Sequence, residues 1–316
     1  MTTSSAPPDE VPAPLAASEE PATSEDTRSF IVQLTGSGYT PVRHVLVQKY
    51  EREGERRSTL ARFCSNRKHR ALILYLLLLT VWAPDRKPLR SEVWLRAVKV
   101  DQGELTWSAS SLSQGWSDLV AMGMVDRQRQ QRVARLTPRR EDGGEGYSRP
   151  DGKKQADHYF ILPGAFWTEA WFDRLSLPAL CVLLILLKET NDVDDECHLT
   201  YEQTEKWYGI SSSSAKKGYT ELVDVGLVDV RDETAKAPLA PAGVTTHRYY
   251  RLAGPFSTSA RAAARDEARK AARSRGRTAK ADVVPVATDL GGKKTKKKKT
   301  KKAKSSTNST STGAGV

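Results

Sequence analysis

Side chains that can perform catalysis or bind a metal are present in this chain, but they are scattered. The five histidines form no His-x-His pair, and the three cysteines show no metal-ligand spacing. No Gly-Lys pair has the upstream glycine that a nucleotide P-loop requires. The adjacent Tyr249 and Tyr250 offer a nucleophilic hydroxyl, but packing in a predicted strand accounts for at least one of them. We therefore expect no enzyme, no metal site and no cofactor.

Hydroxyl and basic side chains gather on one face of a predicted helix near residue 215. Ile210, Ala215, Tyr219 and Leu222 fall on its buried face at helical spacing. The opposite face carries the side-chain types that contact phosphates and base edges when a helix lies in the major groove of DNA. These candidate DNA-binding residues are Ser211, Ser212, Ser213, Lys216, Lys217 and Thr220. A solvated surface helix has the same composition, so this alternative stays open.

An earlier predicted helix has an uncharged face, and the positive charge lies in the segment after it. The exposed positions of that helix are Ala109, Ser110, Ser113, Gln114 and Ser117. The segment RQRQQRVARLTPRR then supplies Arg127, Arg129, Arg132, Arg135, Arg139 and Arg140. An arginine-rich hairpin can follow phosphates or enter a narrow minor groove, although such a run is also typical of a solvated loop. The later helix is thus the better candidate for reading bases, and the earlier one for a backbone clamp or a dimer surface.

The elements that position these residues occur twice in the chain. GWSDLVAMGMVDRQRQ (115–130) resembles GYTELVDVGLVDVRDE (218–233), ALILYLLLLT (71–80) resembles CVLLILLKET (181–190), and YFILPGAF (159–166) resembles YYRLAGPF (249–256). Each copy predicts an apolar helix, a short polar helix, a third helix capped by Ser108 or Ser211, and two strands. Gly123 and Gly226 end the third helices, where a left-handed residue is favoured. The first copy has extra residues before its third helix and between its last two strands.

Helix, helix, helix, strand, loop and strand is the order of a winged helix. The expected fold is therefore mainly α with small β-hairpin wings (α+β), arranged as two tandem winged helix-turn-helix domains. Arg231 and Arg248 are the candidate DNA contacts on the second wing. Upstream, FIVQL and VRHVLVQKY alternate like a strand pair, and the basic residues around 56–70 are equally compatible with DNA contact and with solvation.

The charge is distributed unevenly along the chain. Residues 1–28 hold six acids and one base, and residues 257–316 hold seventeen bases and four acids. The basic end predicts an Ala/Arg helix with one stripe, Arg261, Arg265, Arg269, Arg273 and Arg277, followed by nine lysines between 293 and 304. Such a tail adds salt-sensitive affinity for any DNA sequence, although a simple solubilising tail remains the alternative.

Composition shifts divide the chain into six segments. We expect a disordered Pro/Ser/acidic segment (1–28), a basic lead-in with possible strands (29–66), the two winged-helix copies (67–168 and 169–256), a basic helix (257–282) and a disordered Lys-rich tail (283–316). The apolar runs are shorter than the ~20 residues that span a bilayer. Three cysteines without a pairing scheme fit a reducing compartment, so we expect a cytoplasmic, nucleoid-associated protein with no membrane partner.

The second copy resembles a family of actinobacterial winged-helix proteins that are regulator-like. The residues that carry the resemblance are RLSLPALCVLLILLKE, WYGISSSSAKKGYTELVDVGLVDVR and KAPLAPAGVTTHRYYRLAGPF, within 172–256. This part is also similar to the broad class of multiple-antibiotic-resistance-type regulators. The tandem arrangement resembles plasmid replication initiators, in which one module dimerises and the other reads origin repeats.

The resemblance implies double-stranded DNA as the partner, bound by Ser211–Tyr219 with support from the wing. A transcriptional regulator is the first expectation, and a homodimer through the first copy accompanies it. An origin-binding initiator of a plasmid or mobile element is the second. An architectural protein that coats DNA through its basic tail is the third.

Overall fold

A computed structural model describes residues 20–49, 58–130, 133–190 and 195–281 of the chain. The described residues up to 274 form one compact unit, and side chains are described within the same limit. About half of the described residues are helical, far more than lie in the small antiparallel sheets. This confirms the expectation of a mainly α protein with β-hairpins.

The first half of the chain contains most of the short elements. Its helices and strands are α1 (Ser24–Gln33), β1 (Tyr39–Arg43), η1 (His44–Leu46), α2 (Thr59–Ser65), α3 (His69–Val81), α4 (Ser91–Val98), α5 (Ala109–Ala121), β2 (Val125–Gln130), β3 (Val133–Pro138), η2 (Gln155–Asp157) and β4 (Tyr159–Pro163).

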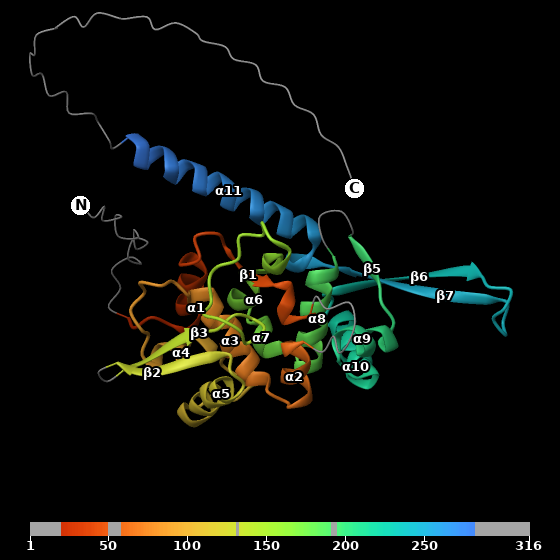
Figure 1. Cartoon of the computed structure of the whole chain (residues 1–316), viewed down its shortest axis with the longest axis horizontal. Helices are drawn as coiled ribbons and strands as arrows, with labels where there is room; N and C mark the ends of the chain where they lie inside the picture. The colour runs from red at the N-terminus through yellow and green to blue at the C-terminus, as the bar shows by residue number, and fades with distance from the viewer. Residues whose placement is uncertain (1–19, 50–57, 131–132, 191–194, 282–316) are drawn as a thin grey trace, which may run out of the picture. The chain divides into compact units, whose positions relative to one another are not determined.

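The second half repeats part of that order. Its elements are α6 (Ala165–Thr168), α7 (Trp171–Arg174), α8 (Leu177–Glu189), β5 (Glu196–His198), α9 (Tyr201–Tyr208), α10 (Ser212–Asp224), β6 (Val228–Lys236), β7 (Val244–Leu252), η3 (Gly254–Phe256) and α11 (Thr258–Ala281). In Figure 1 the paired strands β6 and β7 extend away from α9 and α10. Three helices followed by a hairpin thus occur twice, as α3-α4-α5-β2-β3 and α8-β5-α9-α10-β6-β7, and in the second case the short strand β5 also pairs with β7.

Local signals place the ends of both third helices where the sequence predicts them. The Ser108 hydroxyl accepts a hydrogen bond from the Ser111 N–H at the start of α5, and Ser211 accepts one from Ser214 N–H at the start of α10. Gly123 and Gly226 have φ values of +71° and +74°, the left-handed conformation that ends a helix without a Cβ penalty.

A second pair of matching glycines brings each third helix close to its first helix. A Cβ on Gly115 of α5 would lie 2.6 Å from Leu74 Cδ1 of α3. A Cβ on Gly218 of α10 would lie 2.6 Å from the Pro178 carbonyl oxygen of α8. The repeated glycine is therefore explained by close helix packing in both halves.

The two halves share one hydrophobic core. The buried side chains of α3 and α8 belong to a single contiguous cluster, because both helices are apolar on every face and are covered all around. Helix α2 also packs against α8 across the boundary between the halves. Within the first half, a buried ion pair joins Arg43 of β1 to Glu141 at 2.9 Å, with both side chains at most 2% exposed.

Three expectations about the elements are wrong. Residues 24–28 belong to α1, because Thr23 and Asp26 form a capping box and Ile31 is buried in the core. FIVQL forms the end of that helix and no strand, and β1 pairs with β4 instead. Consequently β4 is not the return strand of the first hairpin, since β2 pairs with β3 through a short connection. Residues 1–19 and 282–316 lie outside the described residues.

Candidate nucleic-acid interface

The exposed face of α5 carries hydroxyl and amide groups, as the sequence predicts. Ser110, Ser113 and Gln114 are exposed, whereas Leu112 and Trp116 are buried on the opposite side. Internal hydrogen bonds order this face: Ser108 and Ser110 hydroxyl oxygens lie 2.8 Å apart, and Gln114 Nε2 donates to Asp118 Oδ1 over 3.0 Å. The face is thus polar, neutral and open to a ligand that hydrogen-bonds.

The hairpin β2–β3 presents arginines beside that helix. Arg127 and Arg129 are exposed and two residues apart on β2, so they share one face of the hairpin. Arg135 is half-buried, and its Nη2 donates to the Pro84 carbonyl over 3.0 Å. Arg139 forms an ion pair of 3.0 Å with Asp126. Arg132 lies outside the described residues, so two arginines of this hairpin stand out as available contacts.

Basic residues of α2 and of the start of α3 contact both ends of α5. Arg62 Nη2 donates to the Met122 carbonyl over 3.2 Å, and Lys68 forms a 2.9 Å ion pair with Asp118. Arg70 donates to the Thr106 carbonyl and lies over the ring of Trp107. Three basic side chains for which the sequence allowed either solvation or DNA contact therefore bind the two ends of α5.

The exposed face of α10 is also as predicted. Ser213, Lys216, Lys217 and Thr220 are exposed, and Ser212 is half-buried. The four residues predicted to be buried, Ile210, Ala215, Tyr219 and Leu222, are each at most 1% exposed. No residue that the structure describes forms an ion pair with either lysine.

A carboxylate lies at the start of α10. Glu205 Oε2 accepts hydrogen bonds from the Ser212 N–H over 3.0 Å and from the Ser212 hydroxyl over 2.5 Å. This negative charge stabilises the positive end of the helix dipole and occupies the place where a phosphate would otherwise bind. Ser212 is thereby engaged within the protein, the Ser213 hydroxyl lies 3.3 Å from that of Ser211, and the two lysines remain open.

The arginines of the hairpin β6–β7 are paired with acids. Arg231 pairs with Glu196 at 2.7 Å and with Glu233 at 3.0 Å, and Arg248 pairs with Asp232 at 2.7 Å. Hydrogen bonds from Arg231 hold the pKa of Glu196 below its usual range. Exposed ion pairs of this kind contribute ~0–1 kcal/mol, so a phosphate can replace the carboxylate as the partner of the arginine. The carboxylate must first be released. This hairpin therefore presents its predicted arginines in ion pairs, whereas Arg127 and Arg129 of β2–β3 are exposed without one among the described residues.

The two halves differ in net charge, a feature that sequence reasoning missed. Residues 67–168 contain seventeen bases and eleven acids, whereas residues 169–256 contain nine bases and fourteen acids. The first half is therefore +6 and the second −5. The difference is visible in the sequence when charge is summed over each repeat, and it is hidden when charge is summed only over the two ends of the chain. A polyanion is attracted to the first half and repelled by the second.

Helix α11 carries only part of the predicted basic stripe. Arg269 and Arg273 are exposed and Arg265 is half-buried, whereas Arg261 is only 2% exposed. The Arg261 guanidinium donates to the Phe256 and Leu187 carbonyls and to the Thr190 hydroxyl over 2.8–3.2 Å. The prediction that Arg261 contacts DNA is wrong, because these acceptors at the end of α8 hold it in the core. The Arg277 side chain lies outside the described side chains.

The tyrosines and histidines that could serve as nucleophiles or metal ligands are either packed in the core or in contact with one partner. Tyr250 is 3% exposed and stacks on Tyr219 at 4.2 Å, which confirms that packing explains one of the adjacent tyrosines. His198 and His247, 49 residues apart, bring their ring nitrogens within 3.4 Å, a contact that the sequence did not reveal. Within the described ranges, no three His, Cys, Asp or Glu side chains gather in a geometry that could hold a metal.

No protein-family model, curated protein sequence or solved structure matches this chain. Among the described residues, no helix has the length and the apolar composition needed to cross a membrane.

Proposed function

We propose that the chain binds double-stranded DNA through two winged-helix modules, with α5 and α10 as the helices that enter the major groove. The observation that carries this proposal is the exposed pair Arg127 and Arg129 beside the polar face of α5, in the half that carries the positive charge. Duplex DNA is a polyanion whose binding is dominated by phosphate contacts, and arginine is the side chain best suited to make them.

The two modules divide the work in this proposal. The first supplies phosphate contacts through β2–β3 and hydrogen bonds through Ser110, Ser113 and Gln114. The second reads base edges with Lys216 and Lys217, two adjacent exposed cations in a half with net negative charge. Phosphate contacts position a protein on the duplex, and base contacts specify the site. Transcriptional regulation is the role we propose first.

Origin binding by a replication initiator is the second candidate role. It is favoured by the opposite charges of two halves with the same element order, since one half can then serve for protein contact and the other for DNA. A dimer formed through the first half fits either role.

Selection from random duplex DNA with the full-length protein tests the proposal. We expect an enriched motif, and we expect Lys216→Gln with Lys217→Gln to weaken binding to that motif much more than to random DNA. The matched control, Lys153→Gln with Lys154→Gln, removes two charges from the loop before η2 and should leave both affinities unchanged. Failure to enrich any motif, together with no retention of random duplex, would contradict DNA binding.

A further inference from the structure

A hollow of about 590 Å³ lies between α4, α5 and the hairpin β2–β3. Its walls come from the start of α4, the first two turns of α5 and both strands of the hairpin. Its lining includes Arg90, Glu92, Trp94, Ser113, Trp116 and Arg127. Its volume falls within the range of ~300–1,000 Å³ that is typical of small-molecule sites.

The floor of the hollow is aromatic and rigid. Trp94 and Trp116 meet edge to face with ring centroids 5.2 Å apart, and they are 5% and 4% exposed. Leu112 and Leu136, also nearly buried, complete the apolar walls. Side chains held this tightly keep the shape of the hollow when nothing fills it, which lowers the entropy cost of binding a ligand there.

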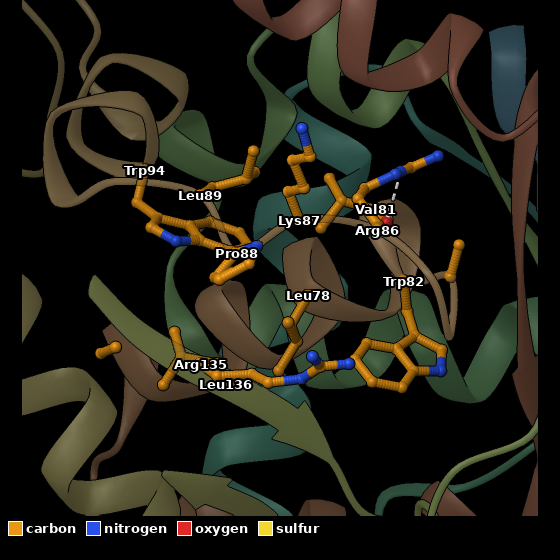
Figure 2. A pocket seen from close by; sticks show the side chains of 12 residues that line it. Leu78, Val81, Trp82, Arg86, Lys87, Pro88, Leu89, Trp94, Arg135 and Leu136 are labelled. Carbon is orange, nitrogen blue, oxygen red and sulfur yellow. Dashed lines mark hydrogen bonds between the residues drawn. The ribbon is translucent and has the colours of Figure 1, made fainter. Parts of the chain in front are cut away.

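An adjoining recess shares part of this lining. Leu89, Trp94, Ala134 and Leu136 border both spaces. Figure 2 shows the recess, in which Leu78 lies at the centre and the Arg135 side chain runs past it toward Trp82. The recess has room for little more than one water molecule at about 30 Å³, so the larger hollow is the binding space.

The charged groups at the edge of the hollow are unbalanced. Arg90 and Arg127 contribute two guanidinium groups, and Glu92 contributes the only carboxylate of the lining. Glu92 Oε1 accepts a hydrogen bond from the neighbouring Ser91 hydroxyl over 3.3 Å. No described residue forms an ion pair with Arg90 or Arg127. Glu92 can neutralise one of the two arginines, so one positive charge remains for an anionic ligand at this edge.

We propose that this hollow binds a small amphipathic organic anion, with a flat apolar body against the tryptophans and an anionic group at Arg90 and Arg127. At about 590 Å³ the hollow has the size of a small-molecule site and is too small to admit a DNA duplex. Ser113 and Arg127 border the hollow and also belong to the DNA surface proposed above. A bound ligand and DNA therefore exclude one another. This mutual exclusion rests on the proposed function, whereas the binding of the ligand itself is independent of it.

A panel of planar aromatic carboxylates, from benzoate to 1-naphthoate, tests the site with the full-length protein. Saturation-transfer NMR detects binding, and 1-naphthalenemethanol serves as the uncharged counterpart of naphthoate. We expect saturable one-to-one binding of naphthoate that is weakened about tenfold by Arg127→Gln, while the binding of the alcohol is unchanged. Arg129→Gln, on the same strand but outside the lining, is the matched control and should bind naphthoate normally.

Filling the hollow gives a second, independent test. Ala134→Trp places a large side chain in it from the hairpin, and Ser113→Phe fills it from α5. Either variant that retains the wild-type melting temperature should lose naphthoate binding. The proposal is overturned if no carboxylate of the panel binds saturably, or if a folded filling variant binds as well as wild type. If the unliganded wild-type protein does not bind DNA, that result contradicts the proposed function and leaves the ligand site unaffected.

Discussion

The matching glycines of α5 and α10 give a quantitative test of the repeated helix packing. In Gly218→Ala, the new Cβ would lie 2.6 Å from Pro178 O, 2.9 Å from Pro178 C and 2.7 Å from Val182 Cγ2. Two of these atoms belong to the backbone of α8, so the helices must separate by about 1 Å to reach a normal contact distance. In Gly115→Ala, the close atom is Leu74 Cδ1, the end of a flexible side chain, and the next lies at 3.8 Å.

The two substitutions should therefore differ in their effect on the free energy of unfolding. Overpacking costs about 1–3 kcal/mol, and replacing glycine by alanine in a helix returns about 1 kcal/mol. Because backbone atoms of α8 cannot move aside, the overpacking cost of Gly218→Ala should be about 2–3 kcal/mol, so the net destabilisation is about 1–2 kcal/mol. We expect Gly115→Ala to stay within about 1 kcal/mol of wild type.

Urea denaturation followed by circular dichroism measures both free energies. Gly146→Ala is the control, because a Cβ there meets no atom within 4 Å, and it should shift the midpoint very little. The packing explanation is refuted if Gly218→Ala is as stable as wild type, or if Gly115→Ala costs as much as Gly218→Ala.

Three further predictions concern anchoring, pH and the tail. Arg261→Ala should lower the free energy of unfolding by about 2–3 kcal/mol, because it leaves Leu187 O and the Thr190 hydroxyl without their donor, and Arg269→Ala should leave it unchanged in the same urea titration. Burial lowers the pKa of His44 and of His69 from 6.5 to about 4. The unfolded chain therefore binds more protons than the folded chain, and the free energy of unfolding should fall as pH drops from about 7 to 4. If His44→Phe loses as much stability between pH 7 and 5 as wild type, this linkage is wrong. Truncation after Ser274 should keep the wild-type melting temperature, whereas truncation after Phe256 removes Arg261 and should lower it; equal melting temperatures of the two fragments would contradict the anchoring role.

Sequence patterns predicted the repeated elements well where the signal is local. Ser108 and Ser211 cap the third helices, Gly123 and Gly226 end them, and helical spacing identified the buried face of α10. These features depend on residues within a few positions of each other, and one sequence contains all the information they need.

Features set by contacts between distant segments could not be read in the same way. The pairing of β1 with β4 joins residues about 120 positions apart. The error over FIVQL is different, because the capping box of Thr23 and Asp26 just before it is a local signal that favours a helix. Arg261 fits an exposed stripe by spacing, but acceptors at the end of α8, about 70 residues earlier, hold it in the core. The hollow beside α5 likewise requires three elements to come together.

The salt dependence of DNA binding tests the central claim most directly. Arg127→Gln with Arg129→Gln in the full-length protein should weaken binding to every duplex and reduce the slope of log K against log salt by about 1.8, since each lost phosphate contact releases ~0.9 fewer counterions. Lys216→Gln with Lys217→Gln should chiefly reduce the preference for the selected motif. An unchanged slope for the arginine double variant would contradict the placement of DNA on the hairpin of the first half.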